Sequence, residues 1–352
     1  MKAEIKALLH EGTVIPAHPL ALNSSRHIDE RRQRLLTRYY IASGAGGVAV
    51  GVHTTQFEIR KPEFNMLEPV LRLASEQVRE SIGDKPFIKV AGIVGPTPQA
   101  LREAELAVKY GYDLGLVSMG GLNDLRESEL IKRLESIAEI IPVFGFYLQP
   151  AVGGRLLSYD FWKDAASIPN LHAIKVAPFN RYQTLDAVRA VCSSGRHEEI
   201  ALYTGNDDNI VADLLTTYRF NVNGKVIEKR FVGGLLGHWA VWTGAAVKLL
   251  HRIKQSVVDN SDVSELLSIG VKVTDMNAAI FDATNNFRGC IPGIHEILRR
   301  QGLLEGIWCL NPEETLSPGQ SEEIDRVCRA YPELTDDEAV KNFLKESFSH
   351  QY

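Results

Sequence analysis

Residues 143–177 read VFGFYLQPAVGGRLLSYDFWKDAASIPNLHAIKVA, and this stretch contains the pattern that decides the fold. An apolar run at each end is short and rich in residues that favour strands. A longer segment of helical character separates the two runs, which is the arrangement of a parallel sheet with crossover helices. The same alternation continues along the chain in both directions. It predicts eight strands, at 13–17, 47–53, 86–94, 114–119, 143–149, 171–177, 200–204 and 232–238.

Eight strands alternating with helices fit a closed (β/α)8 barrel, or TIM barrel, better than an open sheet. An open doubly wound sheet stays possible at this point, because the number of strands does not establish closure. We expect residues 1–258 to form the barrel and residues 259–352 to form a C-terminal helical region. Within 220–230, FNVNGKVIEKR, Asn223-Gly224 predicts a hairpin inserted before the eighth strand.

The composition excludes several classes of protein. Hydrophobic residues make up 45% of the chain and charged residues 24%, as in folded globular proteins. The net charge of -5 predicts no nucleic-acid partner, because such partners require clustered Lys and Arg. No apolar run reaches the roughly 18 residues of a membrane span, so we expect a cytoplasmic protein. The four cysteines lie far apart without a C-x-x-C pair, which predicts reduced thiols and no metal site.

Strand parity draws attention to Lys175. Side chains alternate across a strand, so apolar Ile174 and Val176 are expected to face the helices while Lys175 points into the barrel. Burial lowers the pKa of a lysine, and a neutral amine is a nucleophile. Lys89 also lies in a predicted strand and can share the inward parity, so parity alone does not single out Lys175. An ion-paired or exposed position is the commoner fate of a strand lysine.

Other polar residues fall at the ends of predicted strands. By the same parity rule Tyr147 would enter the barrel beside Lys175, where a phenol can move protons. Adjacent hydroxyls at Thr54 and Thr55 can hold a carboxylate, and Asp207 and Asp208 can contact the rest of a substrate. Each has a structural alternative: a strand tyrosine is often core packing, and threonines and aspartates often cap the next segment.

Several stretches resemble the dihydrodipicolinate synthase / N-acetylneuraminate lyase family of class I aldolases, over about residues 12–239. They are GTVIPAHPLALN, GAGGVAVGVHTTQFE, FYLQPAVGG, NLHAIKVAP, TGNDD and GGLLGHWA. The resemblance implies a Schiff base on Lys175 and a proton relay through Tyr147 and Thr54. It also implies substrate contacts from a further set of residues, namely Thr54, Thr55, Gly205, Asp207, Asp208 and His238.

Departures from the family pattern restrict the reaction. Val152 stands about where dihydrodipicolinate synthases carry an arginine, with Arg155 as the nearest substitute. Residues 118–121, SMGG, stand where those enzymes supply an aromatic relay residue, and Gln56 and Phe57 replace the motif's Gly and Glu. The sequence therefore predicts a lyase or aldolase for a 2-keto acid such as pyruvate that is not a true dihydrodipicolinate synthase.

Three other interpretations remain open. A sugar-acid dehydratase would use the same Schiff-base chemistry, and a non-catalytic keto-acid-binding protein would keep only the pocket. A phosphate-handling barrel is suggested by the glycine-rich residues 233–237, since barrels bind phosphate near that strand. The Schiff-base chemistry needs no metal or other cofactor. The resemblance implies a homodimer or homotetramer.

Overall fold

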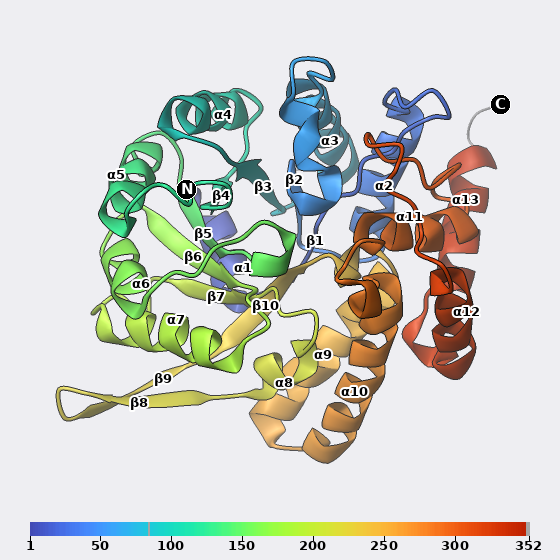
Figure 1. The fold of residues 1–352 in the computed structure, drawn as a ribbon. Helices are drawn as coiled ribbons and strands as arrows, with labels where there is room; N and C mark the ends of the chain where they lie inside the picture. The colour runs from blue at the N-terminus through green and yellow to red at the C-terminus, as the bar shows by residue number, and fades with distance from the viewer. Residues whose placement is uncertain (84, 350–352) are drawn as a thin grey trace.

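Eight parallel strands form a barrel in the computed structural model, which describes residues 1–83 and 85–349 (Figure 1). The order along the sheet is β1-β10-β7-β6-β5-β4-β3-β2, so β1 and β2 are the two edges. A bridge between Ala17 and Ala49 joins these edges, with the amide of His18 donating to the carbonyl of Ala49 at 2.8 Å. The predicted TIM barrel is confirmed. Its strands are β1 (Val14–Pro16), β2 (Gly47–Val50), β3 (Ile88–Ile93), β4 (Leu114–Ser118), β5 (Val143–Tyr147), β6 (Leu171–Val176), β7 (Ala201–Thr204) and β10 (Phe231–Leu236).

Helices follow the strands and surround the barrel. A crossover helix lies on the outside after each of the first seven barrel strands, as a parallel sheet requires. These helices are α2 (Glu30–Ala42), α3 (Leu67–Ile82), α4 (Thr97–Lys109), α5 (Glu127–Ala138), α6 (Tyr159–Ala166), α7 (Arg181–Ser193) and α8 (Ile210–Leu215). The chain then continues through α9 (Thr243–Asp259), α10 (Val263–Ile280), α11 (Cys290–Arg300), α12 (Gln320–Ala330) and α13 (Asp337–Ser349).

Side chains inside the barrel form a core of their own. Apolar residues of alternate parity point inward, among them Val90, Leu116, Phe144 and Leu235, and fill the interior as barrel residues do. Helix α1 (Ala3–Glu11) closes the N-terminal end, where Ile5 and Leu9 join this inner core. The hydroxyl of Tyr203 donates to the carbonyl of Leu9 at 2.9 Å. The N-terminal end is therefore filled, and open space is left at the opposite end.

A second, larger core lies between the strands and the helices, and it extends into the C-terminal helices. Tyr39 of α2 donates to the carboxylate of Asp336 at 2.7 Å, which ties a barrel helix to the segment before α13. Figure 1 shows α11, α12 and α13 on the side of the barrel near α2. Helix α9 ends at Asp259, next to the boundary predicted at residue 258.

The predicted hairpin is present as β8 (Tyr218–Val222) and β9 (Lys225–Lys229), an antiparallel pair outside the barrel sheet (Figure 1). Asn223 and Gly224 adopt φ values of 51° and 83°, the left-handed conformation that a two-residue turn between strands needs. Among the described residues, no helix is both long enough and apolar enough to cross a membrane.

Candidate active site

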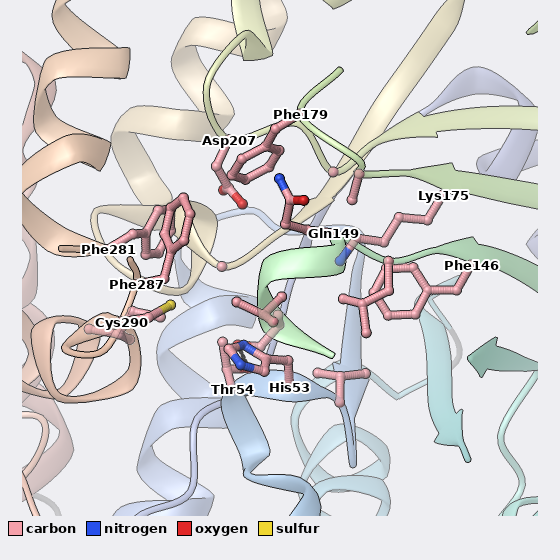
Figure 2. Close-up of a pocket in the computed structure, with 18 residues that line it drawn as sticks. His53, Thr54, Phe146, Gln149, Lys175, Phe179, Asp207, Phe281, Phe287 and Cys290 are labelled. Carbon is pink, nitrogen blue, oxygen red and sulfur yellow. Dashed lines mark hydrogen bonds between the residues drawn. The ribbon is translucent and has the colours of Figure 1, made fainter. Parts of the chain in front are cut away.

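A cavity lies at the C-terminal ends of the barrel strands, where active sites of this fold are built. Its volume is about 630 Å³ with the open mouth included. The loops after the strands and the segment between α10 and α11 supply the wall (Figure 2). The lining residues are Ala17, Val52, His53, Thr54, Phe146, Leu148, Gln149, Val152, Lys175, Ala177, Phe179, Gly205, Asp207, Gly237, Phe281, Phe287, Cys290 and Ile294.

Lys175 points into this cavity from β6, as its parity predicts. Ala173 and Ala177 share its face and belong to the inner core, whereas Ile174 and Val176 face the helices. The side chain lies against Gly205: a Cβ added there would stand 2.4 Å from Lys175 Cε. Glycine at position 205 therefore leaves the room that the lysine occupies.

The Lys175 amine is buried, and it has no hydrogen-bond or ion-pair partner among the described residues. The residue is only 8% exposed, and its Nζ lies 4.4 Å from the centre of the Phe146 ring. None of the residues that the structure describes forms a hydrogen bond or ion pair with this amine. Burial lowers the pKa of Lys175 to about 8, and the negative charge of Asp207 partly opposes that shift. A buried amine with a lowered pKa and no partner is available for covalent chemistry.

Asp207 is the acidic side chain that lines the same cavity. Burial raises the pKa of its carboxyl group above the usual range, and the charge of Lys175 acts in the opposite direction. The amide of His238 donates to Asp207 Oδ1 at 3.3 Å, and Asn277 Nδ2 donates to the Asp207 carbonyl at 2.6 Å. These contacts fix the carboxyl group near Lys175, with a proton affinity suited to transfer near neutral pH.

The placement predicted for Tyr147 is wrong. Phe146, and not Tyr147, pairs with Lys175 across β5 and β6, and paired residues of neighbouring parallel strands share a face. Tyr147 instead faces the helices, where its ring packs on Trp162 at 5.3 Å between centroids. Its hydroxyl donates to the Leu157 carbonyl at 3.2 Å and accepts from the Leu157 amide at 3.3 Å. The parity error arises because Phe144 and Phe146, apolar as they are, fill the interior of the barrel.

Substitution of phenylalanine for Tyr147 is accordingly expected to affect stability and not chemistry. The change removes both hydrogen bonds to Leu157, which should lower the free energy of unfolding by about 1–2 kcal/mol. Urea denaturation measures this loss. Trapping of a keto acid on Lys175 should keep its wild-type rate, and a large fall in that rate would restore a catalytic role for the phenol.

The two threonines are also placed differently from the prediction. Thr54 lines the cavity, but its hydroxyl donates to the Ala17 carbonyl at 2.8 Å. Thr55 is fully buried behind it and donates to the His18 carbonyl at 2.7 Å, while accepting from the amides of Gly51 and Val52. Both hydroxyls therefore hold the loop after β2 in shape, and the predicted hydroxyl pair is not presented to a carboxylate.

Of the other predicted site residues, some line the cavity and some point away from it. Gly205 and Asp207 lie on the cavity, whereas Asp208 turns outward to Arg181, 3.8 Å away. His238 lies behind the wall with its ring against Trp242, and it reaches the site only through its amide. Arg155 is not available for a carboxylate, because its guanidinium donates to the carbonyls of Leu122 and Leu125.

Lys89 proves to be the structural lysine of the two. It faces the outer layer, where its Nζ donates to Ser75 Oγ at 3.0 Å and lies over the ring of Tyr112. Burial lowers its pKa as well, so a lowered pKa alone does not mark the reactive lysine. The position of Lys175 inside the barrel mouth makes the difference.

The cavity also contains residues outside the predicted set, and of these only His53 has a signal in the sequence, since it lies at the end of the second predicted strand, 47–53. His53 and Gln149 bring polar groups to the cavity, while Phe179, Phe281 and Phe287 bring aromatic rings (Figure 2). Burial lowers the pKa of His53 to about 4, so its ring is neutral at pH 7. The side-chain oxygen of Gln149 accepts from the Ala151 amide, and no described residue accepts from its NH2 group. Within residues 1–83 and 85–349, no group of three or more His, Cys, Asp or Glu is arranged to hold a metal ion.

Solved structures provide the comparison, since neither a family model nor a curated protein matches the sequence. Dihydrodipicolinate synthase from Aquifex aeolicus is 18% identical with a TM-score of 0.73, covering 92% of this chain and 99% of that one. N-acetylneuraminate lyase from Fusobacterium nucleatum complexed with pyruvate is 18% identical with a TM-score of 0.71, covering 94% and 98%. This chain has the fold of that family. A prophage protein of the dihydrodipicolinic acid synthase family from E. coli K12, in complex with pyruvate, is similar too, at 18% identity and a TM-score of 0.72 over 90% and 98%. The resemblance predicted from the sequence is thus confirmed in the fold.

Proposed function

We propose that this chain is a divergent member of the dihydrodipicolinate synthase / N-acetylneuraminate lyase family that forms a Schiff base between Lys175 and a 2-keto acid. The observation that carries the proposal is the buried amine of Lys175, which lies in the barrel-mouth cavity without a hydrogen-bond partner among the described residues. Pyruvate is bound in two of the similar solved structures, which supports a keto acid as the ligand.

The chemistry follows from the amine. Neutral Lys175 attacks the 2-keto carbonyl carbon, and loss of water from the carbinolamine leaves a protonated imine. The imine accepts the electron pair of a bond one carbon away. In a lyase this is the C–C bond to a carbon that bears a hydroxyl group: a base takes the hydroxyl proton, an aldehyde leaves, and the enamine that remains is protonated at carbon. In a dehydratase it is a C–H bond: a base takes the proton to give the enamine, which then expels the protonated hydroxyl group of the next carbon as water and becomes a conjugated imine. Hydrolysis of the imine returns the amine in both cases.

Asp207 is the group best suited to move protons, in place of Tyr147. It shares the cavity with Lys175, and its raised pKa lets it accept and return a proton near neutral pH. His53 is neutral because of its lowered pKa and is therefore suited to donate a hydrogen bond and not to supply charge. The NH2 group of Gln149 has no hydrogen-bond acceptor among the residues that the structure describes, and together these two side chains are the candidates for holding the substrate carboxylate.

Reductive trapping tests the proposal. Wild-type protein is incubated with pyruvate or a larger 2-keto acid and reduced with borohydride, and the mass of the intact chain and of its peptides is measured. We expect one stable adduct, located on Lys175. Failure to form that adduct with any member of a panel of 2-keto acids would contradict the proposed function.

The pH dependence of trapping should reflect the environment of Lys175. Only the deprotonated amine attacks, so the initial rate is expected to rise with pH through about 8 and then level off. At pH 7 a pKa near 8 leaves about a tenth of the amine neutral, several hundred times more than an ordinary lysine has. Quenching with borohydride at timed intervals from pH 6 to 10 measures the profile. A rate still rising at pH 10 would indicate an unperturbed lysine.

Catalysis is distinguished from mere binding by hydrogen exchange. An enamine forms when a base removes a proton from the pyruvate methyl group, and in D2O the reverse step adds deuterium. Loss of the methyl proton signal of pyruvate, followed by NMR, therefore measures turnover without any knowledge of the second substrate. A non-catalytic keto-acid-binding protein would give the trapped adduct and no exchange.

A further inference from the structure

The wall of the cavity that faces Lys175 is aromatic. Figure 2 shows Phe281, Phe287 and Cys290 across the cavity from the lysine, with Phe179 near Asp207. Ile294 completes this wall. Phe281 packs against Gly237, where an added Cβ would lie 3.3 Å from the phenyl ring. The side chains opposite the reactive amine therefore offer apolar surface.

Two of these rings are held in a conformation that bulky residues disfavour. Phe179 has a φ of 52° and Phe287 a φ of 65°, in the left-handed region. Their rings meet edge to face at 5.9 Å, although the residues are more than one hundred positions apart in sequence. Such backbone persists only where the surroundings impose it, and it is concentrated at ligand clamps.

Hydrogen bonds from polar groups hold Phe179 and Phe287 in this left-handed conformation. The Phe179 amide donates to Asn206 Oδ1 at 3.3 Å, and the Phe287 amide donates to the Asp282 carbonyl at 3.0 Å. The Asp282 carboxylate in turn accepts from Asn285 Nδ2 at 2.7 Å and from the Gly289 amide at 3.0 Å. Polar groups thus hold the loop from outside, and the phenyl rings are presented to the cavity.

This wall suits one kind of substrate. A polyhydroxylated tail would bring hydroxyl groups against phenyl rings, where a buried hydroxyl without a partner is unfavourable. A second carboxylate would meet Asp207 and, among the described lining residues, no arginine. Burial raises the pKa of the Cys290 thiol, so that this side chain is uncharged, like the phenyl rings around it. An apolar tail the size of a phenyl group would meet complementary surface on the three phenyl rings of this wall.

We propose that the 2-keto acid carries an apolar, aryl-sized group beyond its reacting carbons, which binds among Phe179, Phe281 and Phe287. The inference rests on the proposed Schiff base at Lys175 and specifies its substrate. It applies whether the bond broken is C–C or C–O, because the apolar tail lies beyond either bond. It makes a sugar acid an unfavourable substrate.

The test compares trapping by three 2-keto acids. These are 4-phenyl-2-oxobutanoate, 2-keto-3-deoxygluconate as the hydroxylated counterpart, and pyruvate as the ligand without a tail. Borohydride is added after equilibration at graded concentrations, and intact mass gives the fraction of chain modified. We expect the phenyl compound to reach half-saturation at a concentration at least about tenfold lower than the hydroxylated one, as burial of a phenyl ring implies.

Variants assign the preference to the wall. Phe287→Ser and, separately, Phe179→Ser should remove most of the advantage of the phenyl compound, measured as the ratio of its half-saturating concentration to that of pyruvate in the same variant. Both residues are only partly buried, so the fold should tolerate the change. Phe220→Ser, in the remote hairpin and also partly buried, is the matched control and should retain the preference.

The outcomes separate the two proposals. Adducts that form as readily with the hydroxylated acid as with the phenyl compound would overturn the inference and leave the Schiff base intact. An unchanged preference in both wall variants would do the same. Absence of an adduct with all three acids would overturn the proposed function, and the inference with it.

Discussion

Replacement of Lys175 by alanine is expected to eliminate the borohydride-trapped adduct and to reduce exchange of the pyruvate methyl protons by at least about 10³-fold. The amine supplies the covalent bond on which every later step depends, and among the described lining residues it is the only lysine. Intact mass and NMR measure the two effects. The variant should remain folded, because no described residue depends on Lys175 for a hydrogen bond or ion pair. Its thermal midpoint should not fall, since the lowered pKa means that burial of this charge opposes folding.

Lys89→Ala is the matched control for that experiment. Lys89 is likewise a strand lysine with a pKa lowered by burial, but it is only partly buried, faces the helix layer and donates to Ser75. Its loss should leave both adduct formation and methyl exchange at wild-type levels. Adduct formation that survives in Lys175→Ala, or disappears in Lys89→Ala, would contradict the assignment of the reactive amine.

The architecture could be predicted from the sequence because the signals for it are local. Each of the eight barrel strands is a short apolar run between helical segments, and all eight were predicted within a few residues of their observed ends. The hairpin was equally readable, since Asn223-Gly224 has the backbone freedom that the turn needs. Lys175 was placed correctly because its neighbours Ile174 and Val176 are apolar and face the helices.

Which side chains of β5 point into the barrel could not be predicted in the same way. Inside a barrel both faces of a strand are buried, so apolar Phe146 and polar Tyr147 were assigned to the wrong sides by a rule suited to half-exposed strands. The register with β6 decides the question, and register depends on the whole sheet. Likewise, the hydroxyls of Thr54 and Thr55 are engaged by carbonyls of the loop after β1, a contact between segments almost forty residues apart.

The aromatic wall was beyond prediction for a related reason. Phe281 and Phe287 come from the C-terminal region, beyond residues 12–239, where the sequence motifs of the resemblance lie. Phe287 reaches the cavity through a left-handed backbone conformation that the residue type disfavours and that Asp282 stabilises. Nothing in the local sequence indicates that this loop returns to the mouth of the barrel.

Substitution of asparagine for Asp207 should separate Schiff-base formation from proton transfer. Asparagine has the same shape and can still accept from the His238 amide, so the site should keep its structure. We expect the adduct on Lys175 to form, while methyl exchange falls by about 10²–10⁴-fold, the usual contribution of a positioned general base. The charge of Asp207 holds the pKa of Lys175 up, so its removal should move the pH midpoint of trapping to a lower value.

Asp208→Asn provides the comparison at the neighbouring position, because Asp208 turns away from the cavity towards Arg181. It should leave both the exchange rate and the pH midpoint of trapping unchanged. A shift of the midpoint in Asp207→Asn without a loss of exchange would mean that the charge of Asp207 raises the pKa of Lys175 while another group removes the proton. His53, which lines the same cavity, would then be the candidate. A loss of exchange together with the shift would assign both effects to Asp207, since one carboxylate beside one amine is then sufficient for the whole proton cycle.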